Sequence, residues 1–171
     1  MSPVLLVSHS DEWVAQRLRR WHVPPWFEVW MVASTRLGDG WAWLAVLLTS
    51  AAQGAAPSHV LAETAAAMVA VNGVQVVVNH AFRRSRPAPT GRCRVPAPDR
   101  FSFPSGHTMN AFASAVLVSM HLPAAALPAF AAAASVGASR VVLQLHFVSD
   151  VVAGAVLGSL LAAGVSAALA G

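Results

Sequence analysis

The chain has 171 residues, of which 56% are hydrophobic and only 11% are charged, well below the ~25% that is usual for soluble domains. Every basic residue is an arginine, and the net charge of +4 is too modest to favour a nucleic-acid partner. The single cysteine, Cys93, excludes an intrachain disulfide.

Long intervals of the sequence contain no charged residue. No Asp, Glu, Lys or Arg occurs in residues 40–62, 64–82, 101–139 or 151–171. A spanning helix needs about 20 mostly apolar residues, so each interval can hold at least one. The sequence therefore predicts an integral membrane protein.

The N-terminal stretch 10–22 predicts a short amphipathic helix, with Trp13 and Trp21 suited to the membrane interface. Five charged residues precede the first apolar run, which is unlike a cleaved signal peptide. We expect an amphipathic segment over residues 1–23 and a single transmembrane domain over residues 24–171.

Six apolar segments follow the amphipathic one, over residues 25–37, 41–55, 58–84, 105–122, 123–145 and 147–170. The first is marginal in length for a span. Gly154, Gly158 and Ala162 form a small-residue stripe that predicts close helix packing. We expect an all-α integral membrane bundle of about six transmembrane helices with its active site at one membrane face.

Three polar motifs interrupt the apolar sequence, namely NHAFRRSRP at 79–87, PSGH at 104–107 and SRVVLQLHFVSD at 139–150. They fall where the third and fifth segments end and the fourth and sixth begin. Successive helices alternate in direction, so all three motifs share one membrane face. Polar residues at this depth are costly and favour a functional site over a purely structural network.

The motifs together predict a metal-free phosphate site. Arg86 and Arg140 carry planar cations that match phosphate oxygens. Ser105 and Gly106 open a helix, where free N–H groups and the helix dipole favour an anion. The sequence shows no Cys/His zinc pattern, and we expect no metal and no cofactor.

The histidines supply the chemistry. His146 and Asp150 are four residues apart, so in a helix they share a face. A carboxylate that accepts the Nδ1–H of His146 would leave Nε2 free as a nucleophile. His107, beside the phosphate cradle, can protonate the leaving oxygen.

These motifs resemble the type 2 phosphatidic acid phosphatase (PAP2) family, whose pattern is Lys-x6-Arg-Pro, Pro-Ser-Gly-His and Ser-Arg-x5-His-x3-Asp. The second and third parts match without a gap, and the resemblance covers most of the chain. It implies a membrane-embedded lipid phosphate phosphatase that works through a phosphohistidine. Substrates in bacterial relatives are phosphatidate, phosphatidylglycerophosphate, and polyprenyl phosphates or diphosphates.

One position departs from the family pattern, because Asn79 stands where the family has lysine. Arg83, four residues on and expected on the same helical face, is our candidate for the missing cation, with Arg84 as a second. Without such a cation, the pocket would hold phosphate less tightly or the protein would be inactive.

Other functions use the same residues. A lipid phosphotransferase would pass the phosphate to an alcohol, a non-catalytic protein would only bind the lipid phosphate, and a haloperoxidase would bind vanadate. Asp39 is expected to cap the second segment rather than to support the pocket.

The membrane orientation depends on arginines. Arg17, Arg19 and Arg20 would lie opposite the pocket if segment 25–37 spans, and the arginines nearest the first segment often set orientation. We therefore expect a multi-pass protein of the inner membrane with both termini in the cytoplasm and the pocket on the extracytoplasmic face.

Overall fold

The computed structural model describes residues 3–39, 48–49, 52–54, 57–87 and 100–170. Its elements are α1 (Pro3–Arg20), α2 (Pro25–Leu37), α4 (Ser58–Phe82), α5 (Gly106–His121), the 3₁₀ turn η1 (Pro123–Ala125), α6 (Ala126–Val142) and α7 (Val148–Ala170). The expected segment 41–55 lies mostly outside the described residues. The all-α prediction is confirmed for the part of the chain that the structure describes.

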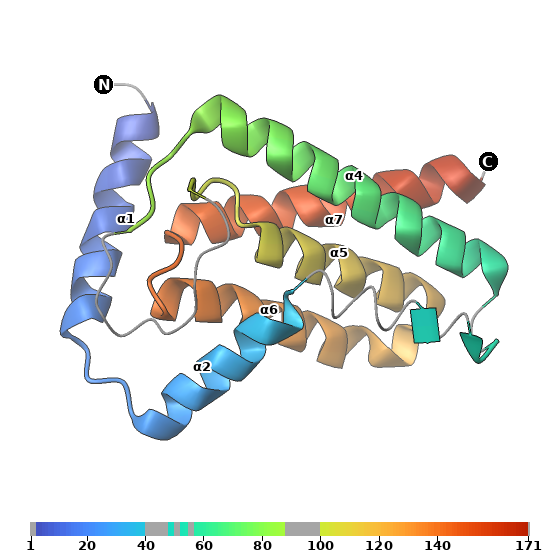
Figure 1. Ribbon diagram of the computed structural model, residues 1–171, viewed down its shortest axis with the longest axis horizontal. Coiled ribbons are helices and arrows are strands. Elements are labelled where there is room, and N and C mark those ends of the chain that lie inside the picture. The colour runs from blue at the N-terminus through green and yellow to red at the C-terminus, as the bar shows by residue number, and fades with distance from the viewer. Residues whose placement is uncertain (1–2, 40–47, 50–51, 55–56, 88–99, 171) are drawn as a thin grey trace.

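Helices α4 to α7 form an up-and-down bundle in which α5 lies in the middle, against α4, α6 and α7 (Figure 1). One side of α5 buries Met109, Ala113 and Leu117 against α4 and α7. The opposite side buries Ala111 and Ala115 against α6. Because α5 packs against three helices, the polar residues in its first turn are held by several elements of the bundle.

The small-residue stripe of α7 lets it approach α5 closely. A Cβ on Gly158 would lie 2.2 Å from the carbonyl oxygen of Met109, and one on Gly154 would lie 2.8 Å from that of Ser105. Any larger side chain would push the helices apart. The predicted packing role of the stripe is confirmed, and it brings the first turns of α5 and α7 together.

Among the residues that the structure describes, three helical stretches are long and apolar enough to cross a membrane, namely Ser58–Phe82, Pro123–Val142 and Val148–Leu169. Their outer faces expose large apolar side chains, including Val69 on α4, Leu127 on α6 and Leu160 on α7. Apolar side chains on these faces would be unfavourable in water but are compatible with contact to lipid chains. The exposed faces therefore agree with a membrane bundle.

Helix α1 lies across the end of the bundle where α4 and α6 finish and α5 and α7 begin (Figure 1). Asp11 of α1 accepts a hydrogen bond from the main-chain N–H of Ser149 in the first turn of α7, at 3.1 Å. After α2, Asp39 contacts His107 at the start of α5. The chain has therefore not crossed the bundle between α1 and Asp39.

This placement corrects the predicted topology. The N-terminal arginines were expected opposite the pocket, and both termini on one side. In the structure α1 lies at the pocket end, and the two termini lie at opposite ends of the bundle (Figure 1). The reason is that α2, only 13 residues long, packs along α6 without carrying the chain across.

Candidate active site

The three polar motifs meet at the end of the bundle that α1 covers. An isolated antiparallel bridge pairs Ser85, just after α4, with Phe101, just before α5. The main-chain N–H of Ser102 donates to the carbonyl of Arg84 at 2.8 Å, and the Ser102 hydroxyl donates to the carbonyl of Ser85 at 3.0 Å. The first motif is thereby joined to the segment that leads into Pro-Ser-Gly-His.

His146 is held between an acceptor and a donor. Its Nδ1 lies 2.7 Å from the carbonyl oxygen of Ser102, which can only accept, so Nδ1 carries the proton. Its Nε2 lies 3.1 Å from a guanidinium nitrogen of Arg86, which can only donate. Nε2 therefore keeps its lone pair, as a nucleophile requires.

The predicted contact between Asp150 and His146 differs from the observed one. Asp150 Oδ2 is 3.7 Å from His146 Nδ1, too long for a hydrogen bond. Its oxygens instead accept from the main-chain N–H of Phe147 at 2.9 Å and from Arg84 at 2.8 Å. The Ser102 carbonyl orients the ring, and a main-chain acceptor leaves no signal in the sequence.

Burial sets the protonation of His146, which lies in the loop between α6 and α7. Loss of solvent lowers the pKa of His146 to about 4, the cations Arg140 and Arg86 act in the same direction, and Asp150 opposes them. The ring is therefore neutral at pH 7, which agrees with the nucleophilic tautomer set by its hydrogen bonds.

The loop that carries His146 is folded back onto Arg140. The carbonyl of Arg140 accepts from the main-chain N–H groups of Leu145 at 2.9 Å and His146 at 3.0 Å. Arg140 is only 1% exposed, and its guanidinium donates to the hydroxyl of Thr35 on α2. Arg86 donates to the carbonyl of Leu145 at 2.7 Å. Both arginines thus hold the loop as well as facing the site.

The start of α5 is fixed by α7 and α4. The main-chain N–H of Ser105 donates to the carbonyl of Asp150 at 3.1 Å, and the hydroxyl of Ser105 accepts from that of Thr108 at 2.9 Å. A Cβ on Gly106 would press on the side chain of Gln75 at 3.3 Å. The helix begins at Gly106, so its first N–H groups have no intrahelical acceptor and suit an anion.

Asp39 lies beside the start of α5, and the segment that it was expected to cap begins outside the described residues. Its Oδ1 lies 2.8 Å from Nε2 of His107. A Cβ on the preceding residue, Gly38, would lie 3.0 Å from Cβ of His107, so only glycine lets the turn approach this closely. The Gly-Asp-Gly sequence signalled the turn, but it did not show which residue the turn would contact.

The geometry gathers a neutral histidine, a second histidine with a carboxylate partner, two arginines and a helix start. The sequence profile of the PAP2 superfamily matches residues 60–170, well over half of the chain. The chain belongs to the PAP2 superfamily.

Relatives agree with this membership. The chain is 37% identical over 118 residues to the decaprenylphosphoryl-5-phosphoribose phosphatase of Mycolicibacterium smegmatis, covering 66% of this chain and 62% of that protein. It is 33% identical over 93 residues to the protein of the same name from Mycobacterium tuberculosis, covering 52% of this chain. The chain thus spans 62% and 49% of the length of these two relatives.

Two solved structures share the PAP2 architecture. The transmembrane PAP2-type phosphatidylglycerolphosphate phosphatase from Bacillus subtilis superposes with a TM-score of 0.81 at 27% identity, covering 95% of this chain and 85% of that one. LpxE from Aquifex aeolicus superposes with a TM-score of 0.70 at 23% identity, covering 88% and 92%, and shows the shared fold. This member of the PAP2 superfamily is a membrane protein.

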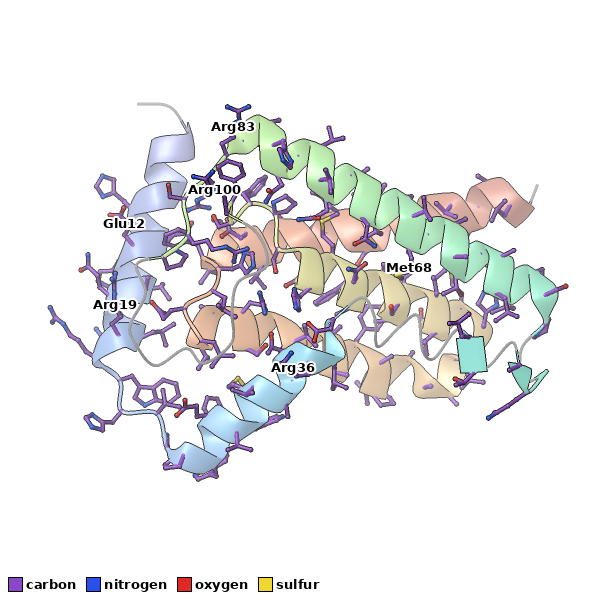
Figure 2. The ribbon with its side chains drawn as sticks, viewed as in Figure 1. Glu12, Arg19, Arg36, Met68, Arg83 and Arg100 are labelled. Carbon is purple, nitrogen blue, oxygen red and sulfur yellow. The ribbon has the colours of Figure 1, made fainter. Side chains whose placement is uncertain are left out.

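The position of the PAP2 lysine is buried and uncharged. Asn79 is only 4% exposed, and its amide donates to the carbonyl of Phe103 at 3.3 Å. Arg83 does not replace the charge, because α4 ends at Phe82 and Arg83 takes a left-handed conformation with φ of 47°. Its guanidinium donates to the carbonyl of His80 and points away from the bundle (Figure 2). The prediction that Arg83 shares a helical face with Asn79 is wrong.

Arg84, the second candidate, turns inward. It forms ion pairs with Asp150 at 2.8 Å and with Asp11 of α1 at 2.7 Å. These carboxylates neutralise its charge, so Arg84 is not free to act as a simple substitute for the PAP2 lysine. Within the described ranges, no group of three or more His, Cys, Asp or Glu side chains could hold a metal ion.

Proposed function

We propose that the protein hydrolyses a lipid phosphate ester without a metal, through a phosphohistidine on His146. The observation that carries this proposal is the position of the His146 ring, whose Nδ1–H is bound by the Ser102 carbonyl and whose Nε2 lone pair faces Arg86. This tautomer is the one that attack of Nε2 on a phosphorus atom requires.

In the proposed reaction, Arg86, Arg140 and the start of α5 at Ser105 and Gly106 hold the phosphate oxygens. Nε2 of His146 forms a bond to phosphorus while the bond to the lipid oxygen breaks. His107 gives a proton to that oxygen, and Asp39 keeps its ring in place.

The second half of the reaction returns the enzyme to its starting state. His107, now neutral, takes a proton from water, and the resulting hydroxide attacks the phosphohistidine. The bond between phosphorus and nitrogen breaks, inorganic phosphate leaves, and Nε2 of His146 regains its lone pair. No oxidant, reductant or metal is required for this balance.

The substrate belongs to the class of phosphate monoesters or diphosphates carried by membrane lipids. The site lies at one end of an apolar bundle, so a lipid can present its head group there while its chain stays among the outer helix faces. The relatives' names support this class, since they specify a decaprenylphosphoryl-5-phosphoribose and a phosphatidylglycerolphosphate.

The decisive experiment is phosphate release by the purified full chain in detergent. The substrates are phosphatidate, phosphatidylglycerophosphate, polyprenyl phosphate, polyprenyl diphosphate and a polyprenyl-linked sugar phosphate, with glycerol present or absent. Release from at least one lipid, lost in a His146→Ala variant, supports the proposal. Formation of glycerol phosphate in place of inorganic phosphate would instead identify a phosphotransferase.

Asn79 favours a second candidate, a protein that binds lipid phosphate with weak turnover. The buried amide donates to Phe103 and brings no charge to the pocket. Saturable binding of a phosphate lipid without release at any pH between 5 and 9 would favour this candidate over the phosphatase.

We further propose that the protein lies in the inner membrane with its pocket on the extracytoplasmic face. Bacterial members of this family commonly carry their sites on the outer face, which supports this orientation. The positive-inside rule favours the opposite orientation, because α1, which carries Arg17, Arg19 and Arg20, lies at the pocket end. The two arguments now oppose each other, and cysteine labelling separates them.

A further inference from the structure

Helix α1 places one buried carboxylate in the catalytic end of the bundle. Asp11 is only 4% exposed, whereas Trp13 on the same helix is 61% exposed. Asp11 Oδ1 accepts from the main-chain N–H of Ser149 at 3.1 Å. Its Oδ2 accepts from the Ser149 hydroxyl and from Arg84, the latter at 2.7 Å. A buried carboxylate with this many donors is held in one position and is not a solvated surface charge.

Arg84 divides its guanidinium between two carboxylates. One terminal nitrogen donates to Asp11, and the other donates to Asp150 at 2.8 Å and to the Ser149 hydroxyl at 2.6 Å. The guanidinium carbon also lies 4.4 Å from the ring centre of Phe147. The first turn of α7, the segment after α4 and helix α1 are thus joined at one cation.

These three charged groups have a net charge of −1 beside His146, since Asp11 and Asp150 contribute −1 each and Arg84 contributes +1. Asp150 is the nearest of them, at 3.7 Å from Nδ1. Without Asp11, Arg84 would cancel the charge of Asp150. The other charged groups that act on His146 are the cations Arg86 and Arg140, which oppose any positive charge on the ring.

The charge matters because the ring becomes cationic when Nε2 bonds to phosphorus while Nδ1 keeps its proton. A net negative neighbourhood stabilises this phosphohistidine and the transition state leading to it. A neutral neighbourhood would leave the developing charge facing two arginines alone.

We propose that Asp11 and Arg84 are positioning residues of the phosphatase site. Asp11 holds Arg84 against Asp150 and keeps the net charge beside His146 negative. This inference rests on the proposed phosphatase function. Helix α1 then contributes to catalysis as well as lying at the membrane surface. The inference also gives a role to Arg84, a residue of the first motif that the phosphatase mechanism does not otherwise use.

The test begins with Asp11→Asn, which preserves the size of the side chain and an oxygen for the Ser149 N–H but removes the charge. We expect kcat to fall about tenfold with KM within about twofold, since the phosphate ligands are untouched. We also expect the acid limb of the kcat/KM profile to move about half a pH unit lower, because His146 becomes harder to protonate. Glu28→Gln, which removes one carboxylate from α2, is the matched control and should leave kcat, KM and the acid limb unchanged.

A double variant separates charge from packing. Asp11→Asn with Arg84→Gln leaves only Asp150 charged, so the net charge returns to −1. Its acid limb should return to within about 0.2 pH units of the wild type, even if kcat stays low because the contacts are lost. Arg84→Lys keeps the charge and should retain more activity than Arg84→Gln.

Three outcomes would overturn the inference. One is an Asp11→Asn variant with the wild-type kcat and pH profile. Another is an equal loss in Asp11→Asn and the charge-preserving Asp11→Glu with no change in profile, which would indicate a structural role alone. The third is a double variant whose acid limb stays with that of Asp11→Asn. An inactive wild type would refute the phosphatase proposal itself.

Discussion

Nε2 of His146 lies 3.1 Å from a guanidinium nitrogen of Arg86, and the carbonyl of Ser102 accepts from the opposite side of the ring. One arginine thus holds the nucleophilic nitrogen in the resting state and can transfer its hydrogen bond to a phosphate oxygen when substrate arrives. The pocket is preorganised by groups that need little rearrangement for the reaction.

Replacing His146 with Ala should lower phosphate release by at least about 1,000-fold, because the covalent step loses its nucleophile. Rapid acid-free quenching of the wild type with ³²P-labelled lipid should trap a phosphoenzyme that is stable in base and lost in acid. His80→Ala, which changes an exposed histidine on α4, is the control and should keep both signals. A His146→Ala variant within tenfold of wild type would reject the assignment.

Excess EDTA should leave the rate within about 20% of its starting value, because the proposed phosphate ligands are arginines and main-chain N–H groups. Vanadate, which adopts the five-coordinate geometry of the transition state, should inhibit competitively. Loss of activity with EDTA and recovery with Mg²⁺ or Zn²⁺ would require a different mechanism.

Much of the site could be predicted from the sequence because its residues are fixed by motif spacing. His107, Arg140, His146 and Asp150 fall at helix ends that must share a face once the bundle alternates. Other features depend on contacts between distant segments. The Ser102 carbonyl is a main-chain acceptor with no residue signature, and Asp11 reaches Arg84 only because α1 folds across the bundle end.

The errors have equally local causes. Arg83 was assigned to the face of Asn79 by helical spacing, but the helix stops one residue earlier and the left-handed turn redirects the side chain. The topology prediction required segment 25–37 to span, whereas α2 has only 13 residues and packs along α6. Helix ends and short apolar segments are where local periodicity gives least information.

Arg83→Ala should leave kcat/KM within about twofold of wild type, since its guanidinium points away from the site. It should match Arg100→Ala, a change at another exposed arginine. Asn79→Lys should instead lower KM by about threefold to tenfold, because it brings a cation to the buried position beside Phe103. A large loss of kcat/KM in Arg83→Ala, with no fall in KM in Asn79→Lys, would instead indicate that Arg83 supplies the charge of the missing lysine.

The pH dependence of kcat/KM should show no loss attributable to His146 between pH 8 and pH 5. The folded-state pKa of His146 is lowered to about 4 by burial, below the ~6.5 of a free histidine. The neutral, active ring therefore persists down to that value, and the rate should fall only as pH drops through about 4. Measurement of kcat/KM with a short-chain lipid phosphate checks this, and an acid limb with its midpoint near 6.5 would contradict the lowered pKa of His146.

Cysteine labelling should decide which membrane face carries the pocket. In a Cys93→Ser background, Arg83→Cys places an exposed thiol beside the pocket, and Ala124→Cys places one in η1 at the opposite end of the bundle. With an outward pocket, a membrane-impermeant maleimide should label Arg83→Cys in intact spheroplasts, and Ala124→Cys only after lysis. The reverse pattern would place the pocket and the α1 arginines in the cytoplasm, as the positive-inside rule predicts for them. Equal labelling of both variants in detergent is the control. If both variants were labelled in intact spheroplasts, the two residues could not lie at opposite ends of a membrane-spanning bundle.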